Sequence, residues 1–287
     1  MKFSRTQRCA NAGLTIGAGL LVLAAAVGCD TMRQDFGEFG DSIMPVSPDE
    51  AARMMMDFSD PDNRRKGTVM ISNSAFGGTD VYVQWYRDSL STETDPLVKA
   101  ASVSALGRFG VPQDAVAIAL CLGEDQPSQV RWEAAKALQR LHNPAVVPIL
   151  LAALRNTDEG ADIRFAAAIA LGQYPQDRVF QALVAALESP RLSVNEASRG
   201  SLTTLTGVDH GLDSKAWLAW YNSVPNPFAD QKEYLYPTYH REETFLEKMA
   251  FWSSKTYEKP APPTGLDSST RRTYQESDDA TADETDR

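Results

Sequence analysis

Residues 130–154 read VRWEAAKALQRLHNPAVVPILLAAL, and this stretch decides the fold. An apolar stripe at helical spacing runs through its first half, on Val130, Ala134, Ala137, Leu138 and Leu141. The triplet His-Asn-Pro at 142–144 interrupts that helix, and a second apolar helix follows. The stretch therefore predicts two helices joined by a tight turn.

The same helix pair is written several times along the chain. Related stretches begin at Val98, Ile163 and Val194, so successive starts lie 32, 33 and 31 residues apart. A weaker copy without the alanine landmarks begins near residue 60. A fixed period of this size indicates a helical-repeat array whose terminal members are atypical. We therefore predict an all-α fold, a right-handed α-solenoid over residues 47–206.

The repeat also carries a recognisable sequence pattern. V-R-x-x-A-A-x-A-L-G, then a turn, then V-x-x-L-x-x-A-L, resembles the short HEAT-like repeats of the bilin-lyase type over residues 48–205. The period is shorter than the roughly 40 to 47 residues of standard HEAT units. Tetratricopeptide repeats, at roughly 34 residues, are the alternative, but their Trp-Leu-Gly-Tyr landmarks do not align. The resemblance implies an interaction scaffold and does not imply lyase activity.

The N-terminus has the composition of a secretion signal. Three basic residues precede an apolar run at 10–28, and Cys29 follows it directly. Ala-Val-Gly-Cys at 26–29 resembles a bacterial lipobox, in which the cysteine is acylated and becomes the mature N-terminus; Ala26 replaces the usual leucine. An uncleaved membrane anchor and a plain cleaved signal are the alternatives, because 19 apolar residues just reach a spanning length. We expect a lipid-anchored protein of the cell envelope that faces the periplasm or the exterior.

Composition shifts divide the rest of the chain. Trp217 and Trp220 share one face of a predicted helix and are expected to cover the open end of the array. Aromatic residues then suggest an extended strap, and acidic residues predominate at the C-terminus. The predicted segments are a signal peptide at 1–28, a tether at 29–46, the solenoid at 47–206, a capping helix and aromatic strap at 207–252, and a disordered acidic tail at 253–287.

Several classes of function are disfavoured. The formal charge of −10 and the lack of a basic cluster in the sequence argue against nucleic acid as a partner. The chain has no nucleophile elbow, P-loop, H-E-x-x-H or paired C-x-x-C motif, and it lacks the His-Glu pairs of HEAT-like iron hydroxylases. We therefore expect no enzyme activity, no cofactor and no metal. The set Asp209, His210 and Asp213 falls short of a closed metal shell, and Cys121 is expected to be a buried, unreactive thiol.

Two repeated features predict contacts within the array. Basic residues just inside each repeat, near several aspartates, suggest a ladder of charge-assisted hydrogen bonds between loops, with an anion-binding stripe as the alternative. The residues are Lys99, Arg131 and Arg164, near Asp95, Asp125, Asp158 and Asp162.

Gly107 and Gly172 lie where first helices are expected to end. His142 is interpreted as a tolerated turn residue, because Gly110 occupies its place in the preceding repeat.

The candidate partner-binding residues are aromatic. Tyr82 and Trp85 belong to a second helix, and second helices are expected to line the concave face. Trp132 and Phe165 occupy equivalent places opposite the core stripe of first helices, where they either pack between repeats or anchor a partner. We expect a membrane-anchored scaffold that binds another envelope protein or peptide. A passive structural lipoprotein and a non-catalytic subunit of an envelope enzyme complex are the alternatives.

Overall fold

The computed structural model describes residues 47–238 and 259–266. By compactness the chain divides after Glu50, and the following account concerns the unit that begins at Ala51. The predicted signal peptide, the tether and Cys29 lie outside the described residues. Across the described ranges, no helix combines the length and the apolar character that a membrane crossing requires.

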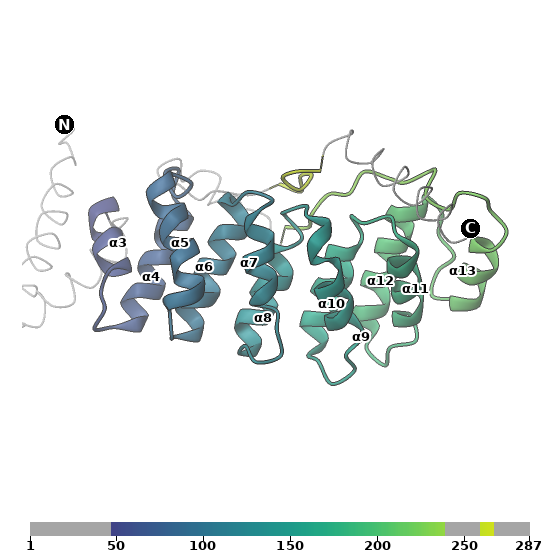
Figure 1. The fold of residues 1–287 in the computed structure, drawn as a ribbon, viewed down its shortest axis with the longest axis horizontal. Helices are drawn as coiled ribbons and strands as arrows, with labels where there is room; N and C mark the ends of the chain where they lie inside the picture. The colour runs from purple at the N-terminus through teal and green to yellow at the C-terminus, as the bar shows by residue number, and fades with distance from the viewer. Residues whose placement is uncertain (1–46, 239–258, 267–287) are drawn as a thin grey trace, which may run out of the picture. The chain divides into compact units, whose positions relative to one another are not determined.

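The described chain is an α-solenoid, as the repeats predict, and its helix pairs follow one another in sequence order (Figure 1). No strand occurs within 47–238 or 259–266. After α3 (Pro48–Met55), first and second helices alternate along the chain, so each first helix is followed in sequence by a second helix. The pairs are α4 (Pro61–Ser72) with α5 (Asp80–Thr92), α6 (Pro96–Phe109) with α7 (Asp114–Leu120), α8 (Ser128–Ala137) with α9 (Val147–Arg155), α10 (Ala161–Leu171) with α11 (Asp177–Ala186), and α12 (Leu192–Thr206) with α13 (Ser214–Tyr221). A 3-10 turn, η1 (Pro144–Val146), leads into α9, and α13 extends the array beyond residue 206.

Asp-Pro pairs begin two of the first helices. The carboxylate of Asp60 accepts the backbone N–H of Asp62, and that of Asp95 accepts those of Leu97 and Val98. A proline follows each aspartate at the first helical position, where a missing N–H costs little. The Asp-Pro landmark of the repeat is therefore a helix start signal.

Leucines at one repeat position form the spine of the core. Leu106, Leu138, Leu171 and Leu205 are all fully buried, each near the end of its first helix. Each such side chain stabilises the fold by about 2 kcal/mol through burial. Alanines on the same helices, such as Ala134 and Ala166, are also fully buried, and successive first helices pack directly against one another. The predicted stripe of residues 130–141 is buried throughout.

The repeat position after each core leucine serves the contact between repeats. A Cβ at Gly107 would lie 2.6 Å from the Cβ of Ala137, and one at Gly172 would lie 2.8 Å from the Oγ of Ser201. At the equivalent position, Gln139 donates from Nε2 to the Ala166 carbonyl at 3.0 Å. The expectation that the glycines terminate helices is therefore wrong for Gly107, which lies inside α6 and allows α6 and α8 to approach closely.

Two residues of the predicted ladder, Arg131 and Arg164, make contacts of the expected kind, but their partners are a glutamate and a carbonyl rather than the expected aspartates. Arg131 pairs with Glu159 at 3.0 Å, and Arg164 donates from Nε to the Leu154 carbonyl at 3.0 Å. In the first repeat, Arg64 makes two hydrogen bonds of 3.0 and 3.1 Å with the Glu93 carboxylate. Asp95, one of the expected partners, instead caps α6, because its short side chain lies next to the first N–H groups of that helix.

The C-terminal end of the array is closed by α13. Gly207 ends α12 with a φ of 80°, in the left-handed region that favours glycine. Asp213 then caps α13 by accepting the N–H groups of Lys215 and Ala216. Trp217 is fully buried, its ring lies edge-on to that of Phe180 at 6.3 Å, and its Nε1 donates to a loop carbonyl. This aromatic packing covers the last second-helix core.

The sequence assigned 253–287 to a disordered tail, but for residues 259–266 the structure differs. The backbone N–H of Thr264 donates to the Arg140 carbonyl, and the His142 N–H donates to the Thr264 carbonyl, both at 2.9 Å. The backbone N–H of Tyr236, in the strap, donates to the Ala261 carbonyl at 3.0 Å. Backbone hydrogen bonding thus attaches this segment (yellow in Figure 1) to the turn after α8. The rest of the predicted tail and the helix expected near residues 241–252 lie outside the described residues.

His142 does more than fill a turn. It is buried, its Nδ1 lies 3.0 Å from the Gln173 Oε1, and its ring stacks on Tyr174 at 4.9 Å. Gln173 in turn donates to the Leu138 carbonyl at 2.9 Å. His142 therefore joins two successive repeats and the returning segment, a role its variable repeat position did not indicate.

Candidate functional site

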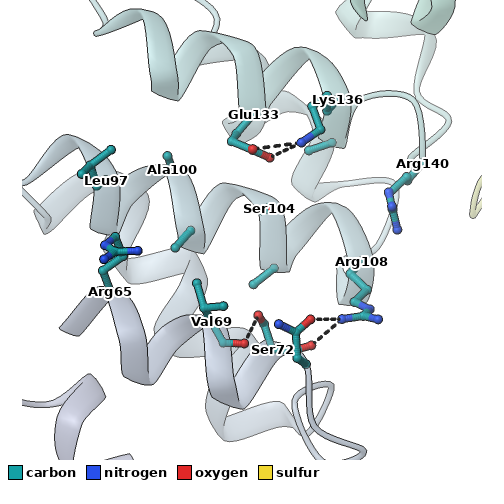
Figure 2. Close-up of a pocket in the computed structure, with 14 residues that line it drawn as sticks. Arg65, Val69, Ser72, Leu97, Ala100, Ser104, Arg108, Glu133, Lys136 and Arg140 are labelled. Carbon is teal, nitrogen blue, oxygen red and sulfur yellow. Dashed lines mark hydrogen bonds and ion pairs between the residues drawn. The ribbon is translucent and has the colours of Figure 1, made fainter. Parts of the chain in front are cut away.

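A pocket of about 300 Å³ lies on the face formed by the first helices α4, α6 and α8 (Figure 2). Small side chains of α6 form its floor, namely Ala100, Ala101, Ser104 and Ala105. Val69 and Leu97 add exposed apolar surface at its edge. Because the floor is made of short side chains, long side chains from the flanking helices rise around it. We call this site the basic pocket.

Positive charge dominates the lining of the basic pocket. Four of the lining residues are basic and one is acidic: Arg65, Arg108, Lys136 and Arg140, with Glu133. Figure 2 shows Arg108 and Arg140 toward one end of the pocket and Arg65 toward the other. The protein as a whole carries a formal charge of −10, so this concentration of positive charge departs from the rest of the chain.

Two of these basic side chains are held in place by partners within the protein. Arg108 donates from one nitrogen to the Ser72 carbonyl at 2.8 Å and to Asn73 Oδ1 at 2.9 Å. Lys136 contacts both oxygens of Glu133 at 2.9 and 3.1 Å. Contacts of this kind fix the position of a charge without removing the net positive charge of the site.

The other two define the ends of the pocket. Arg140 lies with its guanidinium 4.8 Å from the ring centre of Tyr236 in the strap. Arg65 makes a 3.5 Å contact with Asp62, and its buried Nε has no hydrogen-bond partner among the described residues. A planar guanidinium that retains donor capacity suits a carboxylate ligand. The geometry therefore fits an extended segment with spaced negative charges.

Of the predicted aromatic residues, Trp132 lies closest to this site. It is 38% exposed on α8, and the Lys136 Nζ lies 4.1 Å above its ring centre. Because Lys136 also lines the basic pocket, Trp132 stands beside the pocket and shares a contact residue with it. An exposed aromatic next to a charged pocket is a common arrangement at binding surfaces.

The other predicted aromatic residues are elsewhere. Tyr82 and Trp85 are half-buried on α5, where their rings contact Phe76 at 6.0 Å and Phe58 at 6.4 Å respectively. Phe165 is half-buried on α10. The structure therefore does not bring the four aromatic residues together into one site.

Sequence reasoning missed the basic residues, although one signal was available. Arg108 and Arg140 lie 32 residues apart and occupy the same position in consecutive repeats. The sequence pattern is interpreted to place the binding face on the second helices, and these two arginines belong to the first helices and the turns after them. The pocket found among the described residues lies instead on the first helices.

The other residues with possible chemistry have structural roles. Hydrogen bonds from Arg199 and from the Gly211 N–H lower the pKa of Asp209 to about 2, and Asp213 caps α13. Among the described residues, no three His, Cys, Asp or Glu side chains are grouped to hold a metal ion. Cys121 is buried, as expected, and burial raises the pKa of its thiol.

Comparison with a family model agrees with the architecture. A family model for HEAT repeats matches residues 115–203. No curated protein matches this sequence. Among solved structures, the E. coli protein YibA is similar at a TM-score of 0.47 and 15% identity, covering 77% of this chain and 82% of that one. Human deoxyhypusine hydroxylase in complex with glycerol has a TM-score of 0.30 and 16% identity, covering 53% of this chain and 83% of that chain.

The fold rests on the helices and the family match together. Five consecutive helix pairs make up the array, four of them carry the repeated core leucine, and the matched range spans the middle of the array. The described chain is thus an α-solenoid of HEAT-like helix pairs, with residues 115–203 matching the HEAT-repeat family.

Proposed function

We propose that this protein is a lipid-anchored scaffold of the bacterial cell envelope that binds an acidic segment of a partner protein in the basic pocket. The observation that carries the binding role is the pocket itself. Three consecutive first helices supply its walls, and four of its lining side chains are basic. Arginine clusters of this kind recognise acidic peptide motifs by paired hydrogen bonds to carboxylates.

The small floor supports an extended ligand. Alanine and serine side chains leave room along α6, and the adjoining apolar surface of Val69 and Leu97 can accept a non-polar side chain. Trp132 lies beside the pocket and is available as an aromatic contact. The basic side chains attract an acidic ligand, and the apolar edge fixes the orientation in which that ligand binds.

The binding role is tested by placing a photo-crosslinking residue at Ser104, an exposed position on the pocket floor, in membranes that contain the protein. We expect one reproducible partner whose crosslinked peptide is rich in Asp and Glu. Combining this residue with Arg65→Gln and Arg140→Gln should reduce the yield about tenfold, since the lost charge-assisted hydrogen bonds together remove on the order of 1.4 kcal/mol.

The matched controls use surface positions away from the pocket. The same crosslinker at Val116, an exposed residue of α7, should not capture this partner. Lys215→Glu, an exposed charge reversal in the first turn of α13, should leave the yield unchanged. A neutral crosslinked peptide, or equal yields with and without the two arginines, would refute the assignment of the pocket.

The membrane role rests on the lipobox-like sequence before Cys29. Acyl chains bind a bilayer with about 0.8 kcal/mol for each buried methylene, so two or three chains anchor the protein stably. Cys29→Ser should therefore move the protein from the membrane pellet to the soluble fraction. If the variant stayed in the pellet, lipid anchoring would be refuted and the hydrophobic-anchor alternative favoured.

A further inference from the structure

The chain returns to the basic pocket near its C-terminal end. Thr264 exchanges backbone hydrogen bonds of 2.9 Å with Arg140 and His142, forming a parallel bridge opposite Leu141. Gly265 adopts a φ of 91°, and a Cβ there would lie 2.5 Å from the Cγ of Pro112. These contacts hold the segment closely against the array, so the chain continues from a fixed point beside Arg140.

Arg140 is also part of the basic pocket. Thr264 forms a hydrogen bond with the backbone of this pocket residue, and the last described residue, Leu266, lies only two positions further along the chain. The 21 residues that follow, 267–287, begin at the edge of a positively charged site. The charge of these residues determines whether they can bind in the pocket.

The final part of the chain is strongly acidic. Residues 276–287, ESDDATADETDR, contain six acids and one arginine, and we call them the acidic end. Nine residues lie between Leu266 and Glu276, and the ten residue steps from one to the other reach about 33 Å when extended. The pocket crosses three adjacent helices, and axes of packed helices lie about 8 to 10 Å apart, so its far side is within about 20 Å. The acidic end is thus long enough to lie along the whole pocket.

Charge and tethering both favour occupancy of the pocket by this segment. The acids are spaced over 11 residues, so several can face the arginines that lie at opposite ends of the pocket. A tether of about this length gives an effective concentration on the order of 1 mM. A partner peptide present at micromolar concentration must compete with the much higher effective concentration of the tethered segment. An intramolecular acidic segment therefore need not bind tightly to control access.

We infer that the acidic end, residues 276–287, binds in the basic pocket of its own chain and competes there with the acidic segment of a partner. This inference rests on the proposed function, because it assigns regulation to the same pocket. The bound end excludes weak or scarce ligands and yields to a partner that supplies a longer acidic segment or a higher local concentration.

The test places a photo-crosslinking residue at Ala282, in the middle of the acidic end, in the full-length protein. The position follows the last described helix by more than 60 residues in the sequence, so the substitution changes no residue of the helices. After illumination, mass spectrometry should locate the crosslinks on pocket-lining peptides of α4, α6 and α8 within the same chain. Raising the salt from 0.05 to about 0.5 M should reduce them several-fold, because screening weakens exposed ion pairs.

Replacing the six acids by their amides should lower these crosslinks about tenfold, and Arg65→Gln with Arg140→Gln should do the same. Lys215→Glu is the control and should have no effect. Crosslinks spread evenly over the array would overturn the inference. Crosslinks found only in covalent dimers would also overturn it and would identify a second copy as the occupant of the pocket.

Partner capture separates this inference from the proposed function. With the photo-crosslinking residue at Ser104, the amide-substituted chain should capture the acidic partner about tenfold better at limiting partner concentration, as expected for removal of a tethered competitor. If capture depends on the pocket arginines but is unchanged by the amides, the scaffold role stands and the competition is refuted. If capture does not depend on those arginines, the pocket assignment itself fails, whatever the Ala282 crosslinks show.

Discussion

At the scale of single residues, largely buried ion pairs join the helices of the array. Arg64 and Glu93 are an example, since each side chain is only 11% exposed and the pair makes two hydrogen bonds across the first helix pair. Burial acts to raise the pKa of Glu93, but the hydrogen bonds from Arg64 and from nearby backbone outweigh it, and the pKa is lowered from 4.5. The charged form of Glu93 therefore stabilises the folded state.

Glu93→Gln should lower the free energy of unfolding by about 2 kcal/mol at pH 7, because it leaves the Arg64 charge without its carboxylate. Urea unfolding measures the difference from wild type. The pKa of Glu93 is lower in the folded state, so the contribution is complete above its ordinary pKa of 4.5 and is lost as the pH falls through the folded pKa.

The difference between wild type and Glu93→Gln should therefore shrink as the pH falls below 4.5. Asp88→Asn, an exposed change on the same helix, is the control and should change the free energy of unfolding by less than about 0.5 kcal/mol. A difference that stays constant over the same pH range would contradict the assignment of this stability to the ion pair.

At the scale of elements, the spacing between first helices is set by side-chain size at the contact. Gly107 and Gly200 both lie inside first helices, in α6 and α12. A Cβ at Gly107 would lie 2.7 Å from the backbone Cα of Ala137, whereas one at Gly200 would meet no atom within 4 Å. Alanine substitutions at these two positions therefore distinguish the effect of helix propensity from the effect of packing against a neighbouring helix.

Gly107→Ala should destabilise the protein by about 1 to 3 kcal/mol, because the added methyl group forces α6 and α8 apart. Gly200→Ala should stabilise it by about 0.5 to 1 kcal/mol, because alanine favours the helix and nothing obstructs its side chain. Thermal unfolding of the two variants provides the measurement. Equal shifts in the same direction would show that the close approach at Gly107 does not limit the packing.

At the scale of the whole molecule, the stability of the array depends on its ends, because each repeat buries its core against its neighbours. Trp217 is the largest side chain that is fully buried among the described residues, and it closes the last pair against Phe180 of α11. Loss of this closure exposes one terminal interface and leaves the interfaces between earlier repeats intact.

Trp217→Ala should cost about 3 to 5 kcal/mol, the range for removal of a buried tryptophan. Amide hydrogen exchange should rise first in α11, α12 and α13 and only later in α4 and α6, because unfolding begins at the opened end. Leu218→Ala changes an exposed neighbour and should leave the exchange pattern unaltered. A uniform rise along the array would indicate a single cooperative unit and contradict this account.

The sequence by itself determined the period, the pairing of helices and the buried stripe, because these depend on the local rule that one helical face is apolar. Leu106, Leu138 and Leu171 show it, since each recurs at the repeat spacing and each is buried. The closing role of Trp217 followed from the same reasoning.

Only the tertiary structure decided the basic pocket and the return of residues 259–266. The pocket combines Arg65 of α4, Arg108 of α6 and Arg140 of the turn after α8, and only the stacking of these helices sets which side chains meet. The bonds of Thr264 join backbone groups more than 120 residues apart, and backbone pairing leaves no mark on side-chain periodicity. Local burial can therefore be deduced from the repeat pattern, but a site on the exposed faces depends on how the repeats are placed against one another.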